Sequence, residues 1–486
     1  MNIPHLYPEA PGSHPSGVFF AARQALRRHA SGGNVLILAT LLALLAANIP
    51  FTSTLYNEFW QQEVRLQIGS FNLFSHAGHP MSLLAFINDA LMAVFFFTIG
   101  LEIKREILVG ELSSFRKALL PIIAAIGGMV VPVIIFSTLA SGTGYARGAA
   151  IPMATDIAFS LGLLGMLGSR VPLSLKIFLT TLAVVDDIGG IIVIATCYSG
   201  HIEWMLLVYA LILLGVLMLG QLMLIQSKIF YLSVGGIIWF LFLNSGIHPT
   251  IAGVLVAFCV PAKPVFNPRN YIKAMRKAIS HFNADDDDKL TRRSILSPTQ
   301  MDMLKQIESA SDKVISPLQD LEDSLHAIVN YLIVPLFAFA NAGIYLLDMS
   351  PADAFQGVSA SIIIALVAGK LAGIFLFSWG AVSLRIAPMP EATNWKMILG
   401  VSALGGIGFT VSLFIANLSF SPATPDGAQL LNLSKLGIVI GSLVSGLGGM
   451  ALLWAFLPRS TKRRRKAVAA RQASASSTRN TTDHTS

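Results

Sequence analysis

The stretch that decides the fold reads Leu182-Ala-Val-Val-Asp-Asp-Ile-Gly-Gly-Ile-Ile-Val-Ile-Ala195, an apolar run interrupted by two adjacent aspartates. The surrounding segment, 173–198, exceeds the roughly 20 apolar residues that a helix needs to cross a bilayer. A carboxylate at the centre of a bilayer costs about 2.5–3.5 kcal/mol, so ionisable groups found there usually line an ion or proton path. Asp186 and Asp187 are therefore the first candidates for function.

The composition supports a membrane protein. Of the 486 residues, 54% are hydrophobic and 12% charged, whereas a typical soluble domain has about 25% charged residues. The two cysteines, Cys197 and Cys259, lie in apolar stretches, which favours neither a disulfide framework nor a metal site. The net charge of +8 is concentrated in connections and in the C-terminal tail, so we interpret it as a topology signal and expect no nucleic-acid partner.

Apolar windows of about 20 residues divide the chain. They predict about twelve spans, near 34–50, 81–100, 118–140, 147–167, 173–198, 204–225, 229–244, 246–260, 326–347, 359–384, 396–419 and 434–457. The predicted organisation is an N-terminal segment (1–33), spans one to eight (34–260), a long connection (261–325), spans nine to twelve (326–457) and a basic tail (458–486). This is an all-α polytopic membrane protein.

The distribution of basic residues predicts the topology. Lys and Arg are frequent before span one, in every second connection and in the tail, which contains Lys462-Arg-Arg-Arg-Lys466. Basic connections lie on the cytoplasmic side of a membrane. We therefore expect both termini and the long connection in the cytoplasm, and an even number of spans agrees with this.

Two segments outside the spans are distinctive. After the first span, Val64, Leu66 and Ile68 alternate with polar residues and Gly69-Ser70 offers a turn, which predicts a small β-hairpin near 63–74. The hairpin can either pair with a second copy of the chain or cap a loop. The long connection contains Asp285-Asp-Asp-Asp-Lys289, a composition typical of a solvated, partly disordered loop, and its aspartates lack the spacing of a calcium loop.

Two spans contain residues that interrupt a helix. Pro152 and Thr155-Asp156 fall near the middle of span four, and three glycines within four positions (Gly405, Gly406 and Gly408) fall in span eleven. Each span is the middle member of a three-span group, and the two groups run in opposite directions. Interrupted helices at matching positions of such groups indicate a transporter built from inverted repeats.

Charged residues fit the ends of these broken helices. Half-helix ends inside a membrane carry partial charges that need side chains of opposite sign. Asp156 suits exposed N-termini, and Lys370 suits exposed C-termini. Lys370 lies about 16 Å or more from either end of its span, which is too far for comfortable snorkelling to the surface. We expect it to pair with an aspartate of span five.

Motifs along most of the chain then point to one family. They read Met92-Ala-Val-Phe-Phe-Phe-Thr-Ile-Gly-Leu-Glu-Ile-Lys-Arg-Glu106, Ala154-Thr-Asp-Ile-Ala-Phe159, Val185-Asp-Asp-Ile188, Gly246-Ile-His-Pro-Thr-Ile-Ala-Gly253, Pro335-Leu-Phe-Ala-Phe-Ala-Asn-Ala-Gly343, Gly369-Lys370 and Gly405-Gly-Ile-Gly-Phe-Thr410. In this order they resemble the NhaA family of sodium/proton antiporters. The resemblance implies a bacterial inner-membrane protein that exchanges Na+, and also Li+, for H+ without a cofactor.

The resemblance also implies roles for individual residues. Asp187 is expected to be the main cation ligand, helped by Thr155, and Asp186 its partner, able to pair with Lys370. Asp156 and Lys370 are expected at the crossing of the broken helices.

A further set of residues is expected to control the response to pH. It comprises Glu102, Arg105, Glu106, Glu322 and His326 at the cytoplasmic end, with His248 elsewhere. This chain has Gln319-Asp320 where the family has a basic pair, and a longer preceding connection. Both departures leave the pH set-point open.

The paired aspartates also predict how exchange works. Na+ prefers oxygen ligands, and an aspartate binds it only after losing its proton, so the two substrates compete for the same carboxylates. In a site that opens to alternate sides, this competition makes exchange obligatory. If two protons are exchanged for one Na+, one net charge crosses the membrane in each cycle and transport is electrogenic.

Other classes of protein fit the aspartates less well. A sodium-coupled solute symporter needs a polar cavity for the solute. An intramembrane aspartyl protease needs two aspartates that face each other, whereas neighbours on one helix point about 100° apart. In a passive channel, such carboxylates would trap the cation.

Overall fold

The computed structural model describes residues 32–457 with several gaps. The gaps are 69–70, 73, 77–78, 201, 265–300, 303–304, 306–314, 347–348, 351 and 423. The Gly69-Ser70 turn, the 285–288 aspartate run, most of the long connection and the basic tail therefore lie outside the described residues.

Most of the described chain is helical and apolar. Among the described residues, nine helices are long and apolar enough to cross a membrane, and two bent pairs raise the number to 11. The nine are α4–η1–α5 (Leu83–Leu108), α6 (Phe115–Leu139), η3–α7 (Ala146–Met166), α8 (Leu173–Cys197), α9 (Trp204–Leu222), α10 (Lys228–Ser245), α14–η5–α15 (Pro317–Asn341), α16–η7–α17 (Gly357–Ser383) and α20 (Pro425–Phe456). The protein is a polytopic membrane protein, as predicted.

The remaining predicted spans are bent or short. The helices α2 (Gly32–Asn48) and α3 (Pro50–Gln61) meet at 110°, and α18 (Trp395–Leu404) and α19 (Phe409–Ser419) meet at 44°. Span eight is the 10-residue α11 (Thr250–Cys259). It is too short to cross a bilayer alone, which the apolar window at 246–260 did not indicate.

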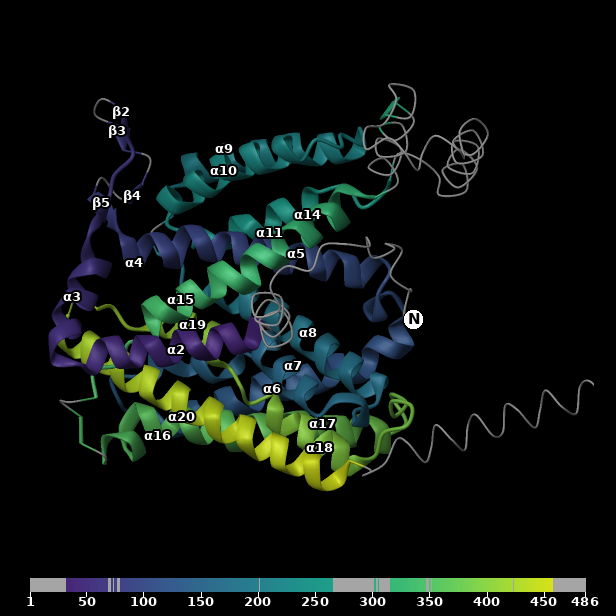
Figure 1. Cartoon of the computed structure of the whole chain (residues 1–486). Helices are drawn as coiled ribbons and strands as arrows, with labels where there is room; N and C mark the ends of the chain where they lie inside the picture. The colour runs from purple at the N-terminus through teal and green to yellow at the C-terminus, as the bar shows by residue number, and fades with distance from the viewer. Residues whose placement is uncertain are drawn as a thin grey trace, which may run out of the picture.

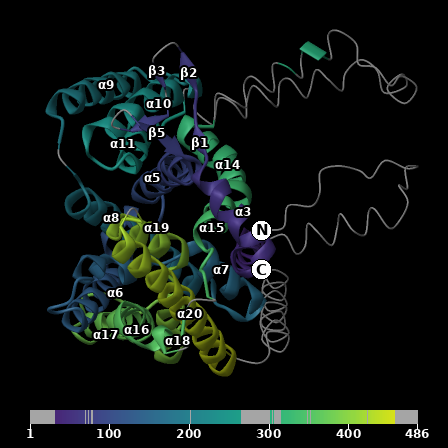
Figure 2. The ribbon, with the colours of Figure 1, turned by 90° about the vertical axis from the view of Figure 1, so that its left-hand side faces the viewer.

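The helices form two groups that lie side by side (Figures 1 and 2). In the first, which we call the panel, α5 (Met92–Leu108) packs against α11 and α14 (Pro317–Ile328), and α9 packs against α10. In the second, the repeat bundle, α6 packs along α17 (Lys370–Ser383), and α16 (Gly357–Ile364) and α18 pack on α20. The repeat bundle contains the two predicted three-span groups.

Both predicted helix breaks are present, and they lie against each other. The 3-10 helix η3 (Ala146–Met153) ends before an extended segment at 154–156, and α7 (Ile157–Met166) follows. The second break separates α18 from α19, and the Asp156 amide donates to Ile407 O at 2.6 Å across the crossing. A Cβ at Gly408 would lie 2.9 Å from Ala154 O, so the close approach of the two breaks requires glycine there.

The predicted hairpin is confirmed and extends further than expected. Strand β2 (Gln67–Ile68) pairs antiparallel with β3 (Phe71–Asn72), within the predicted range 63–74. Strand β5 (His79–Ser82) pairs with both β1 (Glu63–Val64) and β4 (Ser75–His76). The strands project from the end of the molecule at which α3 lies (Figure 1).

Candidate ion-binding site

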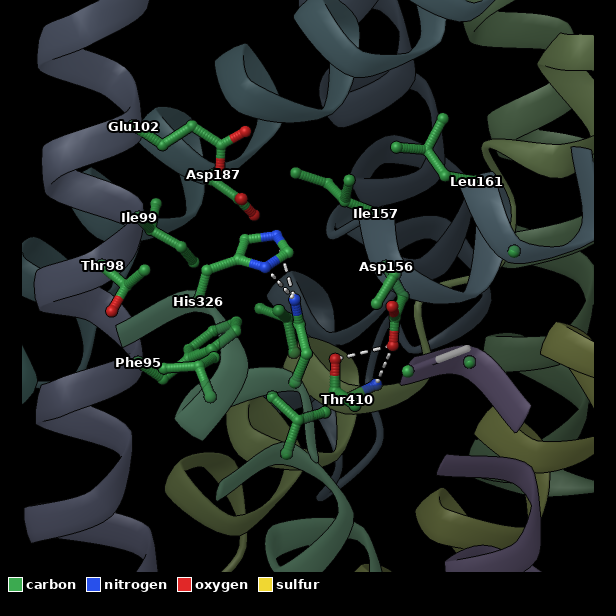
Figure 3. A pocket seen from close by; sticks show the side chains of 18 of the residues that line it. Phe95, Thr98, Ile99, Glu102, Asp156, Ile157, Leu161, Asp187, His326 and Thr410 are labelled. Atoms are coloured by element: carbon green, nitrogen blue, oxygen red, sulfur yellow. Dashed lines mark hydrogen bonds between the residues drawn. The ribbon is translucent and has the colours of Figure 1, made fainter. Parts of the chain in front are cut away.

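A cavity of about 350 Å³ lies between the panel and the repeat bundle. The panel contributes Glu102 from α5 and His326 from α14, and the repeat bundle contributes Asp187 from α8. These side chains lie around one space in Figure 3. Gly32 and Gly33 also line the cavity, so it lies near the first turn of α2 (Gly32–Asn48).

The Asp187 carboxylate is a buried acidic group in the wall of this cavity. Its residue is 5% exposed, and no described residue hydrogen-bonds its side chain. Thr155 and Asp156, in the extended break of span four, line the same space. A buried carboxylate without donors, open to a cavity, is suited to bind either a cation or a proton.

Asp186 points away from the cavity and is held by a lysine. Lys370 Nζ lies 2.6 Å from Asp186 Oδ2, and both side chains are 0% exposed. The ion pair expected between Lys370 and an aspartate of span five is therefore present in the structure. Thr155 Oγ1 lies 2.6 Å from Asp186 Oδ2, 2.9 Å from Lys370 Nζ and 2.9 Å from Gly405 O. The threonine thus links the pair to both helix breaks.

Asp156 lies between the N-terminal ends of two half-helices. Its Oδ1 accepts from the Phe159 amide of α7 at 3.0 Å. Its Oδ2 accepts from the Thr410 amide of α19 at 3.2 Å and from Thr410 Oγ1 at 2.7 Å (Figure 3). A negative charge at this point offsets the positive ends of both helix dipoles, which would otherwise face each other in the membrane.

Comparison with known proteins agrees with this architecture. Residues 23–453 match the family described as Na+/H+ antiporter 1. The chain belongs to this antiporter family. A protein named Na(+)/H(+) antiporter NhaA from Bacteroides fragilis is 53% identical over 426 residues, which cover 87% of this chain and 95% of the relative.

More distant relatives carry the same name. The NhaA protein from Phocaeicola vulgatus is 51% identical over 440 residues, covering 90% of this chain and 97% of the relative. The one from Christiangramia forsetii is 40% identical over 433 residues, covering 89% and 93%. The similarity thus extends over almost the whole length of each NhaA relative.

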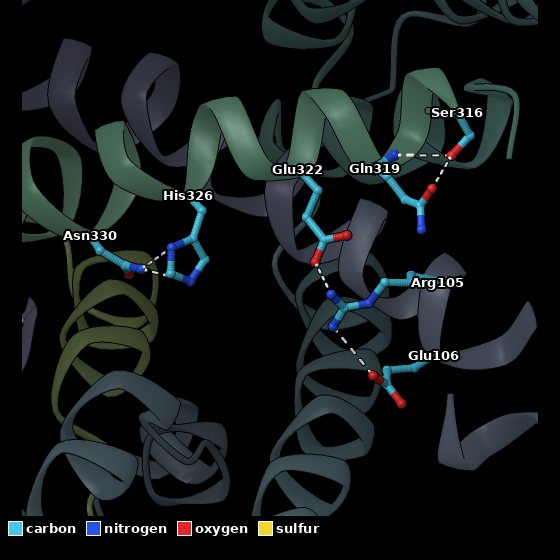
Figure 4. A network of polar contacts seen from close by, with 7 residues as sticks. All are labelled: Arg105, Glu106, Ser316, Gln319, Glu322, His326 and Asn330. Carbon is cyan, nitrogen blue, oxygen red and sulfur yellow. Dashed lines mark hydrogen bonds and ion pairs between the residues drawn. The ribbon is translucent and has the colours of Figure 1, made fainter. Parts of the chain in front are cut away.

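The residues that the NhaA resemblance associated with pH lie in three places. Arg105 Nη1 lies 2.8 Å from Glu322 Oε1, and Arg105 Nη2 lies 3.3 Å from Glu106 Oε1 (Figure 4). The pair between Arg105 and Glu322 joins α5 to α14, whereas Arg105 and Glu106 are neighbours on α5. His326 makes no ion pair with them among the described residues. The Nε2 atom of His326 lies 3.1 Å from Nδ2 of Asn330. His326 also lines the cavity, together with Glu102.

The departure from the NhaA pattern at Gln319-Asp320 has a structural counterpart. Asp320 forms an ion pair with Lys228 at the start of α10. Gln319 lies in the first turn of α14, where its amide donates to Ser316 Oγ at 3.3 Å. Asp320 therefore joins the first turn of α14 to α10. The sequence did not indicate this contact.

His248 lies far from the Arg105 cluster of Arg105, Glu106 and Glu322. Its Nε2 lies 3.7 Å from Asp89 Oδ1, and its Nδ1 lies 2.8 Å from Thr250 Oγ1. Together with Glu203, His248 and Asp89 line a second cavity of about 530 Å³. Glu102 and His326 thus line the Asp187 cavity, whereas His248 lines the second cavity.

Sequence reasoning gave no role to Thr410 or to Asn417. Thr410 follows the glycines of span eleven directly, so its position beside the break was the available signal. Asn341 Oδ1 accepts from Asn417 Nδ2 at 2.9 Å, but the two residues are 76 positions apart. No local pattern indicates such a contact.

Proposed function

We propose that this protein exchanges Na+, and also Li+, for H+ across the bacterial inner membrane by alternating access. The observation that carries the proposal is the Asp187 carboxylate, which is buried, faces a cavity and has no hydrogen-bond donor among the described residues. The family membership and the names of the NhaA relatives support the same exchange.

Asp187 and Thr155 bind the cation in this mechanism. Na+ enters the cavity, displaces the proton from Asp187 and takes carboxylate and hydroxyl oxygens in place of water. Asp186 Oδ1 is buried without a hydrogen-bond partner among the described residues, so this oxygen is available as a further ligand or proton site when the Lys370 pair loosens. Protonation of the aspartates then expels Na+, which couples the two fluxes.

The number of groups that bind protons at the site determines the stoichiometry. Exchange of two protons for each Na+ requires a second proton-binding group beside Asp187, and Asp186 with Lys370 supplies it. One net positive charge then crosses in each cycle, so the membrane potential contributes about 2.3 kcal/mol per 100 mV. Asp156 and Lys370 keep the helix crossing electrically balanced while the site changes sides.

The topology and regulation complete the proposal. Both termini and the long connection lie in the cytoplasm, because basic residues are frequent there. The cavity of Asp187 then opens inward, and the Arg105 cluster lies near its mouth. Glu102, His326 and His248 adjust the response to pH, and the β-strands provide the surface for a homodimer.

The direct test uses proteoliposomes that contain only this protein. A preformed pH gradient is monitored with a fluorescent probe while NaCl is added, with the potential either clamped or free. We expect Na+ and Li+, but not choline, to dissipate the gradient, and we expect clamping to change the rate. If Na+ leaves the gradient intact at every pH, the protein is not a sodium/proton exchanger.

A further inference from the structure

Three asparagines form a chain of hydrogen bonds across the interface between the panel and the repeat bundle. Asn341 Nδ2, at the end of α15 (Val334–Asn341), donates to Asn88 Oδ1 in the π-helix η1 (Ile87–Leu91) at 2.8 Å. Asn341 Oδ1 accepts from Asn417 Nδ2 of α19 at 2.9 Å. Asn341 is 0% exposed. The amide chain thus joins two panel helices to a half-helix of the repeat bundle.

A layer of aromatic rings lies between this amide chain and the cavity. Phe414 of α19 is 0% exposed, and its ring centroid lies 5.6 Å from that of Phe96 and 6.4 Å from that of Phe337. The His248 ring meets it edge-on at 5.2 Å. Phe414 is therefore the one side chain of the repeat bundle in this ring cluster of described residues.

Two helices show the same order of layers. In α19, Val411 lines the cavity, Phe414 follows one turn later and Asn417 lies beyond it. In α15, Val334 lines the cavity, followed by Phe337 and then by Asn341. At about 1.5 Å per residue, the amides lie about 10 Å beyond the wall of the cavity. The rings and amides are thus stacked at its closed end.

The second cavity lies on the opposite side of this layer. It is lined by Asp89, the neighbour of Asn88, and by His248, which contacts Phe414. Between the Asp187 cavity and this second cavity, the panel and the repeat bundle meet at the Phe414 rings and the Asn341 amides. Relative movement of the two groups has to separate these contacts before the aspartates are open to the second cavity.

The chemistry of the layer suits a barrier that opens repeatedly. Packed rings exclude water and ions from the path. Amides that are satisfied by one another in the closed state can be satisfied by water in the open state, so opening leaves no buried polar group unpaired. A purely apolar layer would instead expose carbon to water when it opened.

We propose that Phe414 and the Asn88–Asn341–Asn417 amide chain form the barrier that closes the aspartate site at the end opposite its cavity. The second cavity, with Asp89 and His248, is the mouth on that side. This inference rests on the alternating access of the proposed function and adds the residues that separate the two open states.

Thiol labelling tests the barrier without requiring transport. In the full chain with Cys197→Ser and Cys259→Ser, Val411→Cys places a reporter on the cavity side of Phe414. A positively charged, membrane-impermeant methanethiosulfonate reagent is added to the outside of intact spheroplasts, and the labelled fraction is measured by mass spectrometry. The parent reporter should react slowly from this side.

Weakening the layer should open the route. We expect Phe414→Ala and Asn341→Ala each to raise the outside labelling rate at least about tenfold, since the first removes the ring of the repeat bundle from the layer and the second removes a hydrogen-bond partner from both Asn88 and Asn417. The matched control is Asn48→Ala, which also loses two side-chain amide hydrogen bonds to a distant part of the chain, to Ile344 O and from the Leu346 backbone amide in the segment after α15, both at 2.7 Å. It should label like the parent.

A second variant guards against a general loss of structure. Replacing all three asparagines by leucine should keep outside labelling at the parent rate but slow exchange at least about tenfold, because the polar contacts that open with water are gone. If Phe414→Ala and Asn341→Ala label no faster than Asn48→Ala, the barrier lies elsewhere. Labelling reports on the barrier even if exchange is absent, so failure of this inference and failure of the proposed function give different results.

Discussion

Replacing Lys370 by methionine should destabilise the protein strongly. Lys370 Nζ and Asp186 Oδ2 are 2.6 Å apart, and both side chains are 0% exposed. Methionine has nearly the length and volume of lysine, so little cavity is created. What remains is a carboxylate with the Thr155 hydroxyl as its donor and with Oδ1 unpaired among the described residues. Breaking a buried pair from one side lowers the free energy of unfolding by about 3–5 kcal/mol.

Two further variants test whether the loss in the free energy of unfolding comes from the unpaired charge of Asp186. In Lys370→Met with Asp186→Asn no uncompensated charge is left, so most of the lost stability should return. Lys435→Met removes another buried lysine, 7% exposed, that has no ion pair among the described residues, so its effect should be clearly smaller.

Equilibrium unfolding in mixed detergent micelles, at an alkaline pH that ionises carboxylates, measures all three variants. If Lys370→Met unfolds at the same free energy as the parent protein, or no more easily than Lys435→Met, then the pair does not stabilise the helix crossing.

Three further substitutions test other parts of the site. Asp187→Asn should abolish Na+-driven proton release in everted vesicles while the melting temperature stays close to that of the parent, because no hydrogen bond from a described residue is lost. Thr410→Val should lower the free energy of unfolding by about 1 kcal/mol, since it removes one hydrogen bond to Asp156; an unchanged value would argue against a stabilising contact. Arg105→Gln should change the pH profile of the maximal exchange rate, because the ion pair between Arg105 and Glu322 that joins α5 to α14 is lost. An unmoved profile would exclude the Arg105 cluster from regulation.

The membrane spans and the helix breaks could be predicted from the sequence because their causes are local. Pro152 lacks a backbone donor, and Gly405, Gly406 and Gly408 weaken a helix wherever they occur. The hairpin was likewise visible in the alternation of Val64, Leu66 and Ile68. Each of these signals lies within one continuous stretch of no more than about 20 residues.

Contacts between distant residues had no such signal. Charge alone suggested a partner for Lys370, but not which of the two aspartates it contacts. The Asn341–Asn417 contact joins single polar residues of separate apolar spans, and neither span indicates the partner of its own asparagine. Span eight looked long enough as an apolar window, yet Pro249 and the left-handed Gly246 (φ +84°) delay its helix to Thr250.

The central claim is that Na+ and H+ compete for the same aspartates, and the half-saturating Na+ concentration tests it most directly. It is measured in proteoliposomes at a series of pH values, together with the maximal rate. Over the range in which the aspartates titrate, each unit of lower pH should raise the half-saturating concentration about tenfold for one competing proton, and more steeply for two. The maximal rate at saturating Na+ should barely change. A half-saturating concentration that stays constant from acid to alkaline pH would contradict a shared site.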